Sequence, residues 1–135
     1  MGDIDEFWII NEGGLCLYTI SVENESNLDL GLFSGFVTAI DQFGENLSNS
    51  QIQKLNLGKN LIVFKKNFKS KLLFVGSTTK SSEKKLRKIL GELEEKFLAT
   101  YSKDVIADWN GDISTFEDFS EEIKYLFRGK KRKSK

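Results

Sequence analysis

The sequence predicts an α+β fold in which a five-stranded antiparallel sheet carries one helix on one face and two helices on the other. Three observations predict it. Five short apolar-rich segments are separated by short polar turns or by a helix, which favours antiparallel hairpins. Two of them, 61–64 and 72–75, are apolar at four successive positions, so both faces of the sheet need cover. Three further segments repeat apolar residues at helical spacing and can supply that cover.

The first two strands are predicted to form an N-terminal hairpin. The apolar run 7–10 is followed by the turn signal Glu12-Gly13-Gly14 and by a second strand at 15–20. Cys16 lies in the second strand, where a lone cysteine is more typical of a small buried hydrophobe than of a reactive thiol.

A helix over 29–43 and an edge strand within 48–57 are predicted next. The helix shows apolar residues at three- and four-residue intervals. In the strand, Leu55 and Leu57 alternate with polar residues, as expected where one face meets water. The following Gly58-Lys59-Asn60 predicts a hairpin turn and not a phosphate loop, because the earlier glycine of a Walker motif is missing. Residues 65–71 are predicted to be a polar linker between the last two strands.

Two helices are predicted after the last strand. The first covers 83–101, with Ser81 or Ser82 as its N-cap. The second is predicted to begin at the capping box Ser114–Glu117. Its apolar face is Phe116, Phe119, Ile123 and Leu126, and the acids Glu117, Asp118, Glu121 and Glu122 are more typical of solvation than of catalysis. Trp109, in the turn before it, is predicted to plug the end of the core.

Composition removes most catalytic chemistry. The single cysteine excludes an internal disulfide and a cysteine-based zinc site. The absence of histidine removes Ser-His-Asp and Cys-His mechanisms and histidine-ligated metals, and leaves only carboxylate or lysine chemistry. We therefore expect no enzyme activity, no metal and no cofactor. No apolar run is long enough to span a membrane, and the start lacks the features of a secretory signal. The single cysteine favours a cytoplasmic protein, which could lie at a membrane surface.

The net charge of zero conceals two oppositely charged parts. The last eight residues carry six positive charges, leaving 14 basic against 20 acidic residues in the rest of the chain. We expect one domain at 1–127 and a basic disordered tail at 128–135. The tail either contacts an anionic membrane surface or another polyanion, or only aids solubility, while nucleic acid is not expected as a partner of the acidic domain. Its basic residues are Arg128, Lys130, Lys131, Arg132, Lys133 and Lys135.

The order of the predicted elements is strand, strand, helix, three strands and two helices. Together with Gly13-Gly14 between the first strands and the Phe116/Phe119 face of the last helix, this order resembles the longin domain, a profilin-like module. Longin domains occur in longin SNAREs, in the small chains of clathrin adaptors and in subunits of trafficking complexes. The resemblance covers about residues 6–127 and includes the longin-type proteins of archaea.

The resemblance implies a non-catalytic protein-interaction module, an adaptor or scaffold subunit of a small-GTPase or vesicle-trafficking-like system. The implied partners are a small GTPase, another longin- or roadblock-like subunit, or a second copy of the chain in a homodimer. The implied surface combines the helix 29–43 with the edge strand 51–57, through Leu32, Phe36, Ile40, Phe43, Leu55 and Leu57. The alternative is a small-ligand sensor of PAS or GAF type, which predicts an internal cavity.

Overall fold

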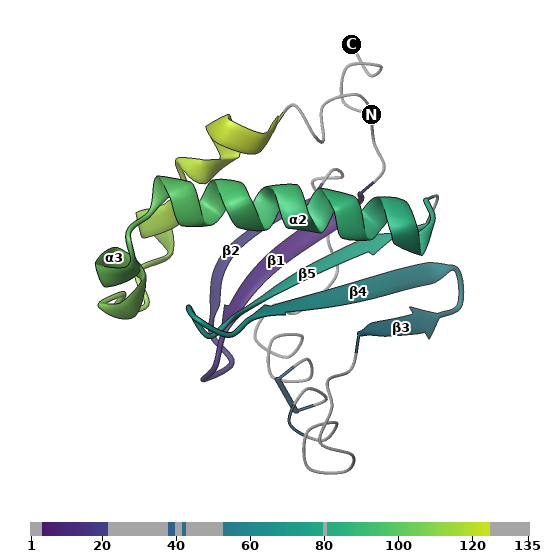
Figure 1. Cartoon of the computed structure of the whole chain (residues 1–135), viewed down its shortest axis with the longest axis horizontal. Coiled ribbons are helices and arrows are strands. Elements are labelled where there is room, and N and C mark those ends of the chain that lie inside the picture. Colours follow the sequence, from purple (N-terminus) through teal and green to yellow (C-terminus); the bar gives the residue numbers. More distant parts are fainter. Residues whose placement is uncertain (1–3, 22–37, 40–41, 43–52, 80, 125–135) are drawn as a thin grey trace.

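The computed structural model describes residues 4–21, 38–39, 42, 53–79 and 81–124, and these form an antiparallel five-stranded sheet with helices packed on it (Figure 1). The strand order is β2-β1-β5-β4-β3. The α+β class and the five-stranded antiparallel sheet are thereby confirmed. The elements are β1 (Glu6–Asn11), β2 (Cys16–Ser21), β3 (Lys54–Leu57), β4 (Asn60–Asn67), β5 (Leu72–Thr78), α2 (Glu83–Thr100), α3 (Lys103–Ala107) and the 3-10 helix η1 (Ile113–Phe116), and residues 119–124 are also helical.

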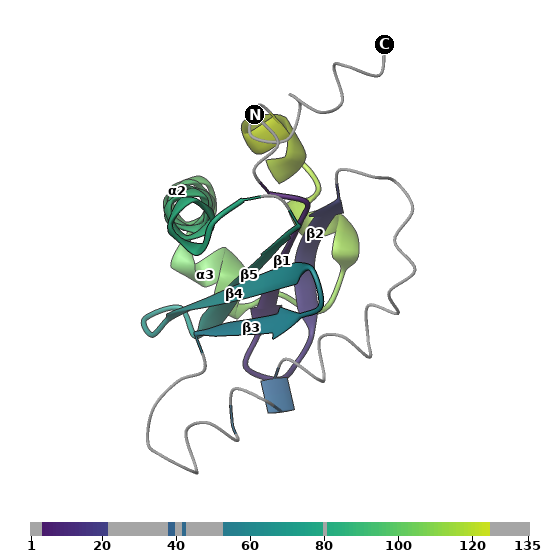
Figure 2. The same cartoon turned by 90° about the vertical axis from the view of Figure 1, so that its right-hand side faces the viewer.

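Helical segments lie on both faces of the sheet. α2 and the C-terminal helical residues lie on one face, and the described residues of the predicted helix 29–43 lie on the other (Figures 1 and 2). Those residues, Thr38, Ala39 and Gln42, are helical, in agreement with the prediction. The rest of that predicted helix lies outside the described residues.

Two apolar cores confirm that both faces of the sheet are buried. Facing α2, strand residues such as Phe7 and Phe74 pack against Leu86, Leu90 and Phe97, all fully buried. The opposite face has its own cluster of buried strand residues, Trp8, Ile10, Ile62, Phe64, Leu73 and Val75. Neighbouring residues of one strand therefore enter different cores, which explains why the central strands are apolar without alternation.

Gly76 in β5 allows α2 to lie close to the sheet. A Cβ atom at this position would lie 3.0 Å from the Cδ1 of Ile4 and 3.1 Å from the Cδ2 of Leu90. Real Cβ atoms are rarely so close to another atom, and both neighbours are fully buried. The helix is thus seated over a strand position that has no side chain.

A β-bulge in β2 changes which of its side chains enter the core between the sheet and α2 (the α2 core). Ile9 pairs with Tyr18 and Ile10 pairs with Cys16, which leaves Leu17 as the extra residue. As a result, the consecutive residues Leu17 and Tyr18 both belong to the α2 core. Cys16 packs against the opposite core and is half-buried, with its Sγ 3.3 Å from the carbonyl oxygen of Tyr18. This supports the interpretation of Cys16 as a small hydrophobe.

One predicted strand boundary was wrong, and one short helix was not predicted. β4 continues through Lys65, Lys66 and Asn67, where a polar linker was predicted, and only 68–71 form the turn. The strand continues because Glu94 on α2 lies 3.2 Å from the Lys65 Nζ and accepts a 2.7 Å hydrogen bond from the Asn67 amide. α3 was not predicted, because five residues are too few to show a helical repeat.

The predicted capping box at Ser114 is also wrong. The N-cap of η1 is Asp112, whose Oδ1 accepts hydrogen bonds from the Ser114 backbone N–H at 2.9 Å and from its hydroxyl at 2.8 Å. Ser114 is therefore inside a 3-10 turn and cannot cap the helix that follows. The predicted apolar face is nevertheless confirmed for Phe116, Phe119 and Ile123, which are fully buried, while Leu126 lies outside the described residues.

Trp109 closes the end of the α2 core, as predicted. Its half-buried ring lies 5.9 Å from the ring of Phe116, and its Nε1 donates a 2.9 Å hydrogen bond to the carbonyl oxygen of Asp112. The four acids of the C-terminal helical region are exposed, which agrees with their interpretation as a solvated face.

Candidate interaction surface

β3 is an outer strand of the sheet, and the side that faces away from β4 is the candidate interaction surface. In the described part of the chain β3 pairs only with β4, in the register Lys54↔Val63 to Leu57↔Asn60. The predicted edge strand is therefore confirmed. The turn that follows contains only Gly58 and Lys59, and Gly58 has a φ of +62°, a left-handed conformation that favours glycine.

The pairing register shows which backbone groups of β3 face outward. The Phe64 N–H donates a 3.0 Å hydrogen bond to the carbonyl oxygen of Gln53. Because hydrogen-bonded and non-hydrogen-bonded pairs alternate in an antiparallel ladder, Leu55 also directs its N–H and C=O toward β4. Lys54 and Asn56 therefore direct theirs away from the sheet. An added strand could pair with these two residues.

The two faces of β3 differ in character. Leu55 is half-buried and packs against the apolar core opposite α2. On the other face Lys54 reaches the N-terminus of α2, where its Nζ lies 3.0 Å from Glu83. Glu83 also accepts a 2.9 Å hydrogen bond from Arg87, which donates to the Gln53 carbonyl at 3.1 Å.

These contacts set the charge state of Glu83. Hydrogen bonds from Lys54 and, to a smaller extent, from Arg87 hold the pKa of the Glu83 carboxyl below its ordinary value. The sequence predicts the Glu83–Arg87 pair from its four-residue spacing, but the link to Lys54 and Gln53 was missed. Those residues are some thirty positions away, and no local pattern signals the contact.

Only part of the predicted site can be placed. Leu55 lies on β3 as expected, and the backbone of Leu57 ends that strand. The side chain of Leu57 and the predicted partner residues Leu32, Phe36, Ile40 and Phe43 lie outside the described residues. The same holds for the domain boundary at 127 and for the tail residues Arg128, Lys130, Lys131, Arg132, Lys133 and Lys135, so these stay predictions.

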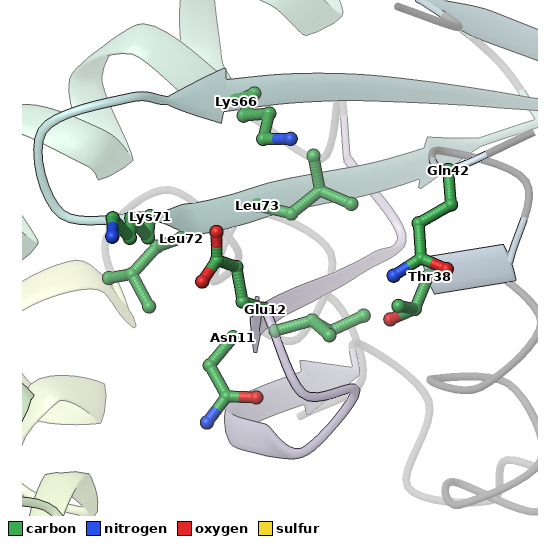
Figure 3. Close-up of a pocket in the computed structure, with 9 residues that line it drawn as sticks. Asn11, Glu12, Thr38, Gln42, Lys66, Lys71, Leu72 and Leu73 are labelled. Atoms are coloured by element: carbon green, nitrogen blue, oxygen red, sulfur yellow. The ribbon is translucent and has the colours of Figure 1, made fainter. Parts of the chain in front are cut away.

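A cleft of about 250 Å³ lies at the end of the sheet near the β1–β2 turn (Figure 3). It is smaller than the ~300–1,000 Å³ typical of sites for drug-sized ligands. Figure 3 shows Lys66 on β4, Glu12 after β1 and Gln42 around it. The full lining is Ile10, Asn11, Glu12, Thr38, Gln42, Lys66, Lys71, Leu72 and Leu73.

The described residues hold neither a metal-binding cluster nor a membrane-spanning helix. They contain no group of three or more histidine, cysteine, aspartate or glutamate residues able to hold a metal ion. None of the helices among them combines the length and the apolar character needed to cross a membrane.

Comparisons with known proteins establish the fold. No family model matches the sequence, and no curated protein matches it. Among solved structures, Myxococcus xanthus MglB is 15% identical over 71% of this chain and 85% of its own, with a TM-score of 0.50. A chain of the mammalian SRP receptor is 18% identical over 100% of both chains, with a TM-score of 0.54. These likenesses support a longin-like fold. They do not test the resemblance to archaeal longin-type proteins.

Proposed function

We propose that this chain is a non-catalytic protein-interaction module, an adaptor or scaffold subunit that docks on a small GTPase or on another longin- or roadblock-like chain. The observation that carries the proposal is the outer side of β3, a strand edge with outward backbone groups on a longin-like fold. Membership of a vesicle-trafficking-like system, a cytoplasmic location and a homodimer belong to the same proposal.

Strand addition fits the chemistry of this edge. A partner strand beside β3 would form main-chain hydrogen bonds with Lys54 and Asn56 and could contact the half-buried Leu55. Main-chain bonds supply affinity and depend little on sequence, while side-chain contacts supply specificity. Such a surface suits a partner-binding role better than catalysis.

The first experiment is a pull-down from native lysate with the full chain, in GDP and in a non-hydrolysable GTP analogue, read by mass spectrometry. We expect a small GTPase enriched in one nucleotide state together with a second longin- or roadblock-like chain. Recovery of neither, under conditions that retain a small molecule on the chain, would contradict the proposal and favour a ligand sensor.

A single substitution in β3 tests the edge itself. Asn56→Pro removes the outward N–H while leaving the β3–β4 ladder intact, because proline is compatible with an edge position. We expect at least a tenfold loss of affinity for the recovered partner, measured by calorimetry, since the ring also obstructs an added strand. Asn56→Ala is the matched control, because it keeps the N–H and should bind normally. Equal binding by both variants would exclude strand addition at β3.

The ligand-sensor alternative has one specific observation in its favour, the cleft beside Glu12 and Lys66. Its size and its charged lining suit only a small polar molecule. A rise in Tm with one metabolite, lost in Lys66→Met, would support this alternative.

A further inference from the structure

The β4–β5 turn, residues 68–71, presents an aromatic ring to water. Phe68 is 64% exposed, the largest exposed fraction among the large apolar side chains of the described residues. Moving an apolar ring out of water lowers the free energy of the system. Such exposure at the tip of a hairpin therefore indicates a contact surface.

The same turn is strongly basic. Residues 65–71 contain four lysines and no acid. Lys65 is engaged by Glu94 at 3.2 Å, but Lys69 and Lys71 are exposed in the turn, and the Lys66 Nζ lies 5.6 Å from the centre of the Phe68 ring. The exposed ring thus lies in a lysine-rich segment and has one ammonium group within cation–π distance.

Asn67 holds the turn in a defined shape. Its side-chain oxygen accepts hydrogen bonds from the Ser70 N–H and hydroxyl, both at 2.9 Å, and its carbonyl accepts from the Lys71 N–H at 2.8 Å. Its amide donates to Glu94 at 2.7 Å, which ties the turn to α2. Phe68 is therefore presented by an ordered hairpin, which reduces the entropy lost on binding.

A second exposed apolar residue lies at the same end of the molecule. Asn11 pairs with Leu72, so the β1–β2 and β4–β5 turns are neighbours, at the end where α3 also lies (Figure 1). Leu15 in the first turn is 57% exposed. Val105 on α3 is 43% exposed, but it lies in residues 103–108, which carry two aspartates and one lysine, so that side of the end has a net negative charge.

We propose that the β4–β5 turn is a docking site for an anionic lipid bilayer, with Phe68 and Leu15 entering the interfacial region. Lys66, Lys69 and Lys71 would contact lipid phosphates while their alkyl stems follow the apolar boundary. The site is separate from the basic tail and does not depend on the proposed docking partner. It does not include β3.

The observations favour a bilayer over a macromolecular partner. The turn projects from the sheet, and a soft bilayer accepts a projecting ring without a complementary pocket. Lys69 and Lys71 are exposed side chains, which suits contact with many equivalent lipid phosphates better than recognition of one partner.

Co-sedimentation of the full chain with vesicles tests the proposal. We expect binding to phosphatidylcholine vesicles with about a third phosphatidylserine, weakened by salt, and little binding to phosphatidylcholine alone. Phe68→Ser should reduce the partition coefficient about tenfold. Lys66→Glu with Lys69→Glu should reduce it about 25-fold or more, near fivefold for each lysine.

Two matched control variants test whether vesicle binding depends on this site or only on the total charge and exposed apolar area of the chain. Val105→Ser removes an exposed apolar side chain from the acidic side of the same end and should change binding less than twofold. Lys84→Glu with Lys85→Glu makes the same charge change on exposed positions of α2 and should have a much smaller effect. Circular dichroism checks that each variant is folded.

Depth of insertion gives an independent readout. In Phe68→Trp, brominated lipids should quench the added fluorescence beyond the background of Trp8 and Trp109, measured in the unsubstituted chain. Deletion of 128–135 should leave a residual binding that Phe68→Ser removes. Unchanged binding of Phe68→Ser, equal losses in the two lysine pairs, or tighter binding to single-stranded RNA than to vesicles would each overturn the proposal.

Discussion

The two outer strands of the sheet are secured in different ways. β2 packs against the C-terminal segment, where the Tyr18 hydroxyl lies 2.7 Å from the Ser120 hydroxyl and its ring meets Phe119 edge-to-face at 5.3 Å. Beyond its pairing with β4 and the half-buried Leu55, β3 is held to α2 by exposed polar contacts of Glu83 and Arg87.

This difference separates a structural strand from an available one. Phe119 is fully buried, so the cover over β2 is part of the folded core. Exposed ion pairs contribute little to stability, because water and salt screen them. The cover of β2 should therefore persist in any complex, while β3 can exchange its contacts for those of a partner.

The largest effect is expected when the cover of β2 is removed. Phe119→Ala should lower the free energy of unfolding by about 3–5 kcal/mol, because it leaves a cavity beside the rings of Tyr18, Phe97 and Tyr101. Urea unfolding monitored by circular dichroism measures it. Leu55→Ala on β3 is the matched change and should lose only about 1 kcal/mol, since Leu55 is half-buried. Similar losses at the two strands would contradict the comparison.

A smaller effect is expected from the Tyr18 hydroxyl. Tyr18→Phe removes its hydrogen bond with Ser120 and should lose about 1 kcal/mol at neutral pH. Burial raises the Tyr18 pKa from 10.0 to about 12, so the fold favours the neutral phenol. This contribution to stability is fully present below the pKa that Tyr18 has in the unfolded chain. It is lost as the pH rises from about 10 to about 12. Unfolding at pH 9 and pH 11 should show a shallower alkaline decline for Tyr18→Phe than for the unsubstituted chain.

The smallest effect is expected at β3. Glu83→Gln removes the charge that links Lys54 and Arg87, and should lower Tm only slightly because the group is exposed. The pKa of Glu83 is lowered in the fold, so its contribution is present above the ordinary glutamate value and is lost as pH falls through the folded value. Calorimetry at neutral and acidic pH, with and without salt, measures it. A loss that persists in high salt would show that Glu83 has a packing role.

The fold was predictable where burial left a local trace in the sequence. The runs at 61–64 and 72–75 predicted strands covered on both sides, and the spacing of Leu86, Leu90 and Phe97 predicted α2. The remainder of β4 was not predictable, because its polar residues are stabilised by Glu94 on α2, far away along the chain. Likewise, Ser114 and Glu117 match the capping-box pattern, but the Ser114 N–H donates its hydrogen bond to the Asp112 side chain.

The candidate site was predictable to a lesser extent. Alternation around Leu55 identified the edge strand, yet nothing local indicated that α2 would reach it. The polar character of residues 65–71 predicts a linker and gives no role to Phe68, although a single aromatic residue among lysines is a visible signal. The buried residues of a strand are easier to predict from sequence patterns than the residues that a turn exposes.

Gly76 also bears on how distant relatives of this chain could be recognised. Apolar positions in the two cores can exchange for other apolar residues of similar volume, so their identities carry little information. At Gly76 even an alanine would require Ile4, Leu86 and Leu90, all fully buried, to move together. Gly76 is therefore the position at which the packing of α2 restricts the residue type most strongly.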